Sequence, residues 1–137
     1  MGIEELRIGN LLQEHNGKHV IVDGIDDKRI RTKSDGMHWY LPNKFNPIPL
    51  NSDILEKSRF ILASNHIYEY KDNSYLLFDE PDDWQNTGSY PIGISGVESN
   101  ILGGFVSYGE VVIRCLYLHQ LQNLFYAITG KELEIEL

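Results

Sequence analysis

Apolar and polar residues alternate along most of the first 41 positions, a pattern typical of half-buried β-strands. The segment "HVIVDGI" shows it most clearly, and "KRIRTKS" and "MHWYL" continue it. Turn-forming pairs separate these segments: Asn16-Gly17, Asp26-Asp27 and Asp35-Gly36. Because an open meander leaves its edges exposed, we predict a small SH3-like barrel. Its four short antiparallel strands are expected at residues 8–15, 18–25, 28–34 and 37–41.

The stretch "EHNGKH" at residues 14–19 contains two histidines and a glutamate, residue types that bind metal ions. If its Asn-Gly pair forms a two-residue type I′ turn, Glu14 faces His19 across the hairpin. His15 and His19 then point to opposite faces, where they do not bind one ion together. The sequence therefore predicts turn chemistry here and no metal site.

The pattern changes at "NPIPL", residues 46–50, because its two prolines cannot donate backbone hydrogen bonds to a sheet. The next segment predicts a helix of about two turns, after the N-cap candidates Asn51, Ser52 and Asp53. Alternation returns in "RFILA", "HIYEYK" and "SYLLFD", which predict a second antiparallel sheet. Residues 80–110 are rich in glycine and predict loops with irregular short strands.

A helix is predicted near the end of the chain, in "LYLHQLQNLFYAITGKELEIEL". Gly130 stands where a left-handed C-cap is needed. The apolar stripe at three- and four-residue spacing comprises Tyr117, Leu121, Leu124, Phe125 and Ile128. The final "ELEIEL" alternates and could add a strand. The whole pattern predicts an α+β fold: a meander, a short helix, a second antiparallel sheet and a C-terminal amphipathic helix.

A chain of 137 residues has the length of one domain, which we predict over 1–137, with a subdivision into 1–46 and 47–137 as the alternative. Twelve Lys and Arg against twenty Asp and Glu give a net charge of −8, which disfavours general binding to phosphate backbones. Cys115 is the only cysteine, so we expect a reducing compartment. No segment predicts a signal peptide or a membrane span, so we expect a cytoplasmic protein without a membrane partner.

Cofactor motifs do not occur in the chain: neither GxGxxG nor GxxxxGK[ST] is found, and the acidic residues 79–83 lack calcium-loop spacing. We expect no cofactor and no metal. A catalytic site would need His38, His66 or His119 as general base and Cys115 or a serine as nucleophile. The apolar neighbours of Cys115 predict a buried thiol with a raised pKa and little reactivity. An enzyme is therefore the least favoured interpretation.

Opposite its apolar stripe, the C-terminal helix carries a cluster of uncharged polar side chains. Exposed helix faces usually carry Glu and Lys instead. These polar groups could bind a partner, or they could bond to neighbouring loops of the same chain. An aromatic-rich loop earlier in the chain offers a second surface. The candidate protein-binding residues are His119, Gln120, Gln122, Asn123, Trp84 and Tyr90.

A basic segment beside two aromatic residues suggests nucleic-acid binding as an alternative function. Arg29, Arg31 and Lys33 share one face if the strand is regular, and Trp39 could stack on bases. The same three charges are also ordinary for an exposed strand face. Nucleic acid is therefore the second interpretation, behind a protein partner.

Three segments resemble a family of small uncharacterised proteins from Bacteroides-type gut bacteria and their phages or integrated elements. They are "LRIGNL", "PIPL" before "ILEKSRF", and the ending "LHQLQNLFYAITGKEL", whose His-Gln-Leu-Gln-Asn-Leu part is the most specific. Phe125-Tyr126 and Lys131 depart from the Tyr-Phe and Glu expected there. The resemblance implies a mobile-element setting and carries over no catalytic residue. We interpret the chain as an accessory, non-catalytic protein-interaction protein.

Overall fold

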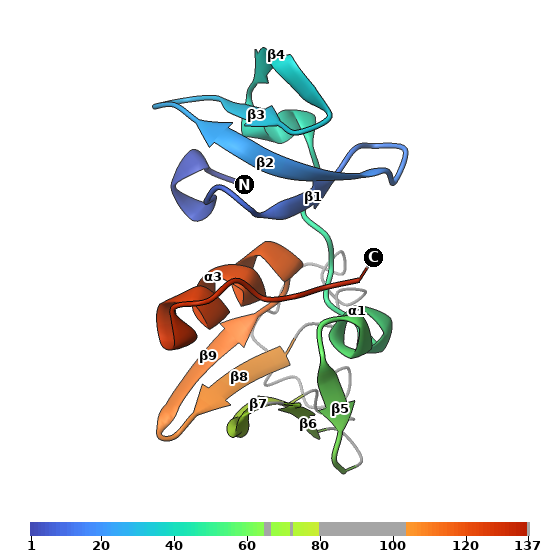
Figure 1. Ribbon diagram of the computed structural model, residues 1–137, viewed down its shortest axis with the longest axis vertical. Coiled ribbons are helices and arrows are strands. Elements are labelled where there is room, and N and C mark those ends of the chain that lie inside the picture. The colour runs from blue at the N-terminus through green and yellow to red at the C-terminus, as the bar shows by residue number, and fades with distance from the viewer. Residues whose placement is uncertain (65–66, 72, 80–103, 137) are drawn as a thin grey trace, which may run out of the picture. The chain divides into compact units, whose positions relative to one another are not determined.

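The computed structural model describes residues 1–64, 67–71, 73–79 and 104–136. The chain divides into two compact units. Unit 1 comprises Met1–Ile48 and Tyr117–Leu133, and unit 2 comprises Pro49–Leu116 and Glu134–Leu137. The predicted α+β class is confirmed, because two antiparallel sheets of four and five strands occur with a few helices (Figure 1).

The first break between the units falls at residue 48, near the subdivision considered at residue 46. The C-terminal helix groups with unit 1, whereas that subdivision placed it with the second part of the chain. Charge divides unevenly: unit 1 carries eight Lys and Arg against eight Asp and Glu, and unit 2 carries four against twelve. The net charge of −8 therefore belongs entirely to unit 2.

The sheet of unit 1 has four strands: β1 (Leu11–Gln13), β2 (His19–Ile25), β3 (Ile30–Thr32) and β4 (Asp35–Tyr40). Two short 3-10 helices, η1 (Ile3–Glu5) and η2 (Pro42–Lys44), lie before and after them in the chain. One face of the sheet is apolar because alternate strand residues point to the same side. The core on that face comprises Leu6, Leu12, Val20, Val22, Ile30 and Phe45.

The predicted small SH3-like barrel is not confirmed, because the sheet of unit 1 is open with the order β1-β2-β3-β4. A barrel closes only when its edge strands pair, and here the edge strands β1 and β4 lie at opposite ends of the sheet. Beyond β1, a single bridge joins Gln13 to Asn46. Strand β4 lies at the opposite edge, and among the described residues it pairs with β3 alone.

The first hairpin differs from prediction by one residue of register. Gln13 pairs with His19, and the Glu14 N–H donates to the Lys18 carbonyl at 2.8 Å. The predicted pairing of Glu14 with His19 is therefore wrong, because His15 joins the Asn-Gly pair in a three-residue loop. Gly17 closes that loop at φ 90°, a conformation that favours glycine.

The predicted turn at Asp35-Gly36 is also wrong. Thr32 pairs with Asp35, so Lys33 and Ser34 form the turn and Asp35 begins β4. The Asp35 carboxylate accepts a hydrogen bond from the Tyr40 hydroxyl at 2.6 Å. This bond keeps the side chain of Asp35 in contact with β4. The side chain of a turn residue would instead face solvent.

Unit 2 contains the predicted short helix, α1 (Ser52–Lys57), with Asn51 as its N-cap. The Asn51 side chain accepts from the Ile54 N–H at 2.9 Å. The predicted second antiparallel sheet is confirmed and continues past residue 103. Its strands are β5 (Phe60–Leu62), β6 (Ile67–Tyr70), β7 (Asn73–Asp79), β8 (Gly104–Tyr108) and β9 (Val111–Cys115).

The sequence predicts loops with irregular short strands over residues 80–110. The structure describes only the last part of this stretch, where Gly104–Tyr108 forms the regular strand β8. Residues 80–103 lie outside the described part of the chain. Strand β8 forms because its alternate residues Gly104 and Val106 are buried while Phe105 and Ser107 are half-buried.

The predicted C-terminal helix is confirmed as α3 (Leu118–Thr129), which ends at Gly130 with φ 75°. Its buried residues are Leu118, His119, Leu121, Gln122 and Phe125, so the buried face is rotated from the predicted stripe. The strand predicted in the "ELEIEL" ending is wrong for residues 132–136, which form no ladder. One isolated bond, from the Glu136 N–H to the Lys57 carbonyl at 3.0 Å, takes its place.

Candidate functional site

The side-chain amide of Gln122 pairs with the backbone just before β1. Its Nε2 donates to the Gly9 carbonyl at 3.1 Å, and its Oε1 accepts from the Leu11 N–H at 2.8 Å. Gln122 is 3% exposed, so both bonds form away from water. Buried backbone groups need such partners. The amide of Gln122 therefore serves these two groups as a neighbouring strand would.

Asn123 extends this contact between α3 and the N-terminal segment. Its Oδ1 accepts from Asn10 Nδ2 at 2.7 Å and from Arg7 Nε at 3.2 Å, while its Nδ2 donates to the Glu5 carbonyl at 2.8 Å. The guanidinium of Arg7 also forms a bidentate pair with the carboxylate of Glu132. Every hydrogen-bonding atom of the Asn123 side chain is thus engaged within unit 1.

His119 lies next to this network and is 1% exposed. Its ring stacks on Tyr117, with centroids 5.9 Å apart and planes inclined by 10°. His119 Nε2 lies 3.7 Å from Glu5 Oε1, which is too long for a hydrogen bond, and neither ring nitrogen has a hydrogen-bond partner among the described residues. Burial lowers the pKa of His119 from its ordinary value of 6.5, so the ring is neutral at pH 7.

Two of the candidate protein-binding residues on the polar face of α3, His119 and Gln122, are buried within the fold. Gln120 is half-buried and accepts from the Tyr117 N–H at 3.1 Å. These contacts, with those of Asn123, fit the alternative in which the polar groups bond to neighbouring segments. Trp84 and Tyr90, the other candidate partner-binding residues, lie outside the described residues.

The side chains of Asp23, Arg31 and Trp39 are in contact on the outer face of the unit 1 sheet. Arg31 Nε lies 3.0 Å from Asp23 Oδ1, and the guanidinium lies 5.2 Å from the centre of the Trp39 ring. Gly24 makes room for this arrangement, since a Cβ there would lie 3.1 Å from Trp39 and 3.2 Å from Arg31. Arg31 is thus held between a carboxylate and an aromatic ring.

The three basic residues predicted as a nucleic-acid surface do not all lie in one strand. Arg31 lies in β3, whereas Arg29 precedes the strand and Lys33 falls in the turn after it. Arg29 pairs with Asp26 at 3.4 Å. Two of the three predicted phosphate-binding side chains therefore already face carboxylates of unit 1.

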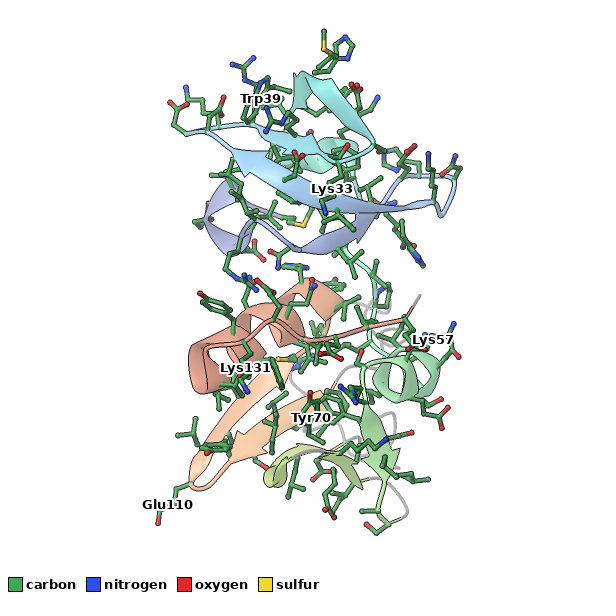
Figure 2. All side chains as sticks on the ribbon, viewed as in Figure 1. Lys33, Trp39, Lys57, Tyr70, Glu110 and Lys131 are labelled. Carbon is green, nitrogen blue, oxygen red and sulfur yellow. The ribbon has the colours of Figure 1, made fainter. Side chains whose placement is uncertain are left out.

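Strand β4 and the residue that follows it expose an apolar stripe, defined here as Met37, Trp39 and Leu41, at alternate sequence positions (Figure 2 labels Trp39). These side chains are 85%, 37% and 56% exposed, respectively. On the opposite face, Tyr40 packs edge-on against Phe45 with centroids 5.8 Å apart. The core face of β4 is therefore anchored, and the apolar stripe faces solvent.

The residues considered for catalysis are not assembled into a site within the described part of the chain. His38 Nδ1 lies 2.9 Å from Asp35 Oδ1, but this histidine is 69% exposed. Bonds from Tyr40 and His38 lower the pKa of Asp35 to about 2. Cys115 is buried as predicted, and burial raises the pKa of its thiol to about 12. His66 lies outside the described residues.

A groove of about 480 Å³ lies in unit 2 beside α1 and β5. Lys57, Arg59 and Lys71 line it together with Glu56, Glu134 and Glu136, and no histidine or cysteine among the described residues does. Arg59 Nη1 donates to Glu134 Oε2 at 2.6 Å, so opposite charges meet within the groove. The described part of this lining provides no nucleophile beside a general base.

The described residues offer neither a metal-binding cluster nor a membrane-spanning helix. No group of three His, Cys, Asp or Glu side chains there is arranged to hold a metal ion. Among the same residues, no helix combines the length and apolar character that crossing a bilayer requires.

Comparison of the chain with protein-family models, with curated proteins and with solved structures finds no match in any of the three.

Proposed function

We propose that this chain is a non-catalytic protein-interaction module, and that unit 1 binds an extended segment of another protein along β4. The observation that carries the proposal is the exposed apolar stripe on an edge strand. An edge strand offers backbone hydrogen-bonding groups to an incoming strand, and alternate side chains supply specificity. Trp39 and Arg31 are also residue types enriched in binding hot spots.

Charges near β4 define the chemistry of the partner segment. Lys33 lies in the turn before β4 and Lys44 in η2 after it, and neither forms an ion pair within the described residues. Opposite charges across an interface favour one orientation and speed association. The partner segment is therefore extended, apolar at alternate positions and acidic near both ends.

Nucleic acid fits this surface less well. Asp23 and Asp26 balance the charges of Arg31 and Arg29, and the guanidinium of Arg31 covers one face of the Trp39 ring. Phosphate binding relies on cations that release counterions, and base stacking needs an open ring face. The mobile-element setting is part of the proposal and is supported only by the resemblance of the three segments named above.

The test is selection of peptides from a random ten-residue display library on the immobilised full chain. Synthetic versions of the selected peptides are then titrated by fluorescence anisotropy against wild type, Trp39→Ala and the control Ile8→Ala. Ile8 is also an exposed apolar residue of unit 1, at 55%, but lies outside β4. A buried hot-spot side chain contributes about 2 kcal/mol or more, so Trp39→Ala should weaken binding roughly 30-fold.

Two results would overturn the proposal. One is a set of selected peptides that bind Trp39→Ala as tightly as wild type. The other is a single-stranded oligonucleotide that binds wild type and loses affinity with Trp39→Ala while no peptide binds, which would favour the nucleic-acid function. Melting temperatures of the three proteins verify that each is folded.

A further inference from the structure

Strand β9 lies at one edge of the unit 2 sheet, whose order is β5-β6-β7-β8-β9 (Figure 1). Three consecutive apolar residues in it, Val111, Val112 and Ile113, are 55%, 61% and 42% exposed. Soluble proteins usually protect an edge strand with charges, proline or a bulge. Residues 111–113 carry no charge and no proline, and their pairing with β8 is regular. This edge is therefore suited to pairing with another strand.

The direction of the backbone groups follows from the β8–β9 hairpin. Tyr108 pairs with Val111 across the two-residue turn Gly109-Glu110. The residues that flank such a turn exchange both backbone hydrogen bonds, and successive residues then alternate in direction. The N–H and C=O of Val112 therefore point away from β8. No backbone group of the described residues bonds to them.

We propose that two copies of this chain associate through β9, in antiparallel pairing with the two-fold axis at Val112. Val112 of one copy then exchanges two backbone hydrogen bonds with Val112 of the second copy. Val111 lies opposite Ile113 of the second copy, and this apolar contact occurs twice because the interface is isologous. The two sheets of unit 2 become one continuous sheet across the axis.

Opposite charges at the two ends of β9 favour this register. With the axis at Val112, the turn residue Glu110 lies near Arg114 of the second copy at both ends of the interface, and opposite charges across a sheet stabilise the pair. Parallel pairing in register would instead place Glu110 beside Glu110 of the second copy and Arg114 beside Arg114. Figure 2 shows Glu110 extending from the tip of the β8–β9 hairpin, away from the ribbon. The side chain is therefore accessible to a second molecule.

The net charge of unit 2 opposes this association. Its value of −8 makes two copies repel each other over distances of about a Debye length, roughly 10 Å at 0.1 M salt. Added salt screens that repulsion, while the apolar contacts and backbone hydrogen bonds of β9 remain. Dimerisation should therefore strengthen between low and moderate ionic strength.

Sedimentation velocity of the full chain tests the association, since the monomer has a mass of 15.8 kDa. Wild type should shift to twice that mass as concentration rises. Val112→Lys places two lysines opposite each other at the axis and should leave the protein monomeric. The matched control is Ile61→Lys on β5, the opposite edge of the sheet, where the side chain is 54% exposed. This control should dimerise as wild type does.

Cysteine cross-linking tests the register without relying on a disruptive change. Val112→Cys should form an intermolecular disulfide on mild oxidation, because directly opposite residues have Cα atoms about 5.5 Å apart. Val111→Cys should not, because two residues of offset separate its two copies by about 8 Å. Cys115 is buried and contributes no background.

Three results would overturn the inference: a wild type that stays monomeric at its highest soluble concentration, a dimer that survives Val112→Lys, or equal cross-linking at both cysteine positions. Larger open-ended assemblies would also contradict a two-fold interface. Trp39→Ala should dimerise normally. A failure of the β9 pairing is therefore distinguishable from a failure of the proposed peptide binding along β4.

Discussion

Gln122 supplies Leu11 with a hydrogen-bond partner at the start of strand β1. The Leu11 N–H donates to Gln122 Oε1 at 2.8 Å, and the same amide returns a bond to the carbonyl of Gly9 at 3.1 Å. A helix side chain thereby completes the edge of a sheet that no further strand covers in the described part of unit 1. The amide therefore has a structural role in joining α3 to β1.

Gln122→Ala should lower the free energy of unfolding by about 2–4 kcal/mol, because each buried backbone group left without a partner costs about 1–3 kcal/mol. Urea unfolding followed by circular dichroism measures the change. Asn43→Ala is the matched control: this amide is exposed and makes no hydrogen bond within the described residues, so its loss should be within about 0.5 kcal/mol of wild type. Equal stability of the two variants would show that the pairing contributes little.

Stability should depend on pH through His119. Burial lowers the pKa of this histidine below the value of 6.5 that it regains on unfolding. Between those two values the unfolded chain binds more protons, so stability falls as pH drops below 6.5 and levels off beneath the folded pKa. The charged groups that act on the ring are Glu5, which opposes the shift, and the N-terminal amine, which adds to it.

His119→Leu removes this titration, so its stability should change less than that of wild type between about pH 7.5 and pH 5. Glu5 contributes a separate dependence at lower pH. The bond from the Gly2 N–H lowers the pKa of Glu5 below 4.5, so its contribution is lost as pH falls through the folded value. His19→Gln, at an exposed position, is the control. Parallel pH profiles for wild type and His119→Leu would contradict the assignment.

Cys115 should be unreactive in the folded protein. Its side chain is 1% exposed and its pKa is raised to about 12, so little thiolate forms at pH 8 and a reagent cannot reach it. A disulfide reagent that releases a coloured thiolate should label it fully only in denaturant. Glu110→Cys, in the exposed β8–β9 turn, is the positive control and should add one rapidly labelled thiol. Rapid labelling of Cys115 in the native wild type would refute this expectation.

Gly24→Ala should disturb the contact between Arg31 and Trp39, since the new Cβ would lie 3.1 Å from the Trp39 ring. The ring must shift by a few tenths of an ångström, at a cost of about 1 kcal/mol. Fluorescence of Trp39 in a Trp84→Phe background reports the shift. Gly36→Ala is the control, because its Cβ would meet nothing within 4 Å. Identical spectra for both variants would mean that Trp39 does not depend on the space at Gly24.

Local chemistry explains which elements could be predicted from the sequence. The Asn51 side chain caps α1 through a bond to Ile54 three residues away, and Gly130 ends α3 in the left-handed conformation. Both signals depend on neighbouring residues alone. The burial of Cys115 followed in the same way from its apolar neighbours.

The errors concern features that depend on distant residues. Closing a barrel requires the two edge strands to pair, and β1 and β4 lie at opposite edges of the sheet. The turn at Lys33-Ser34 replaced the one predicted at Asp35-Gly36 because Tyr40 binds the Asp35 carboxylate from within β4. Turn propensity acts over four residues and does not include such a bond.

The sequence by itself determined the α+β class, most of the strands, and the positions where α1 begins and α3 ends, because periodicity and capping are local properties. Only the tertiary structure decided the role of the polar face of α3. The bonds of Gln122 to Gly9 and Leu11 join positions more than one hundred residues apart. Whether a glutamine faces solvent or completes a sheet depends on which backbone groups the fold brings to it, and no local pattern contains that information.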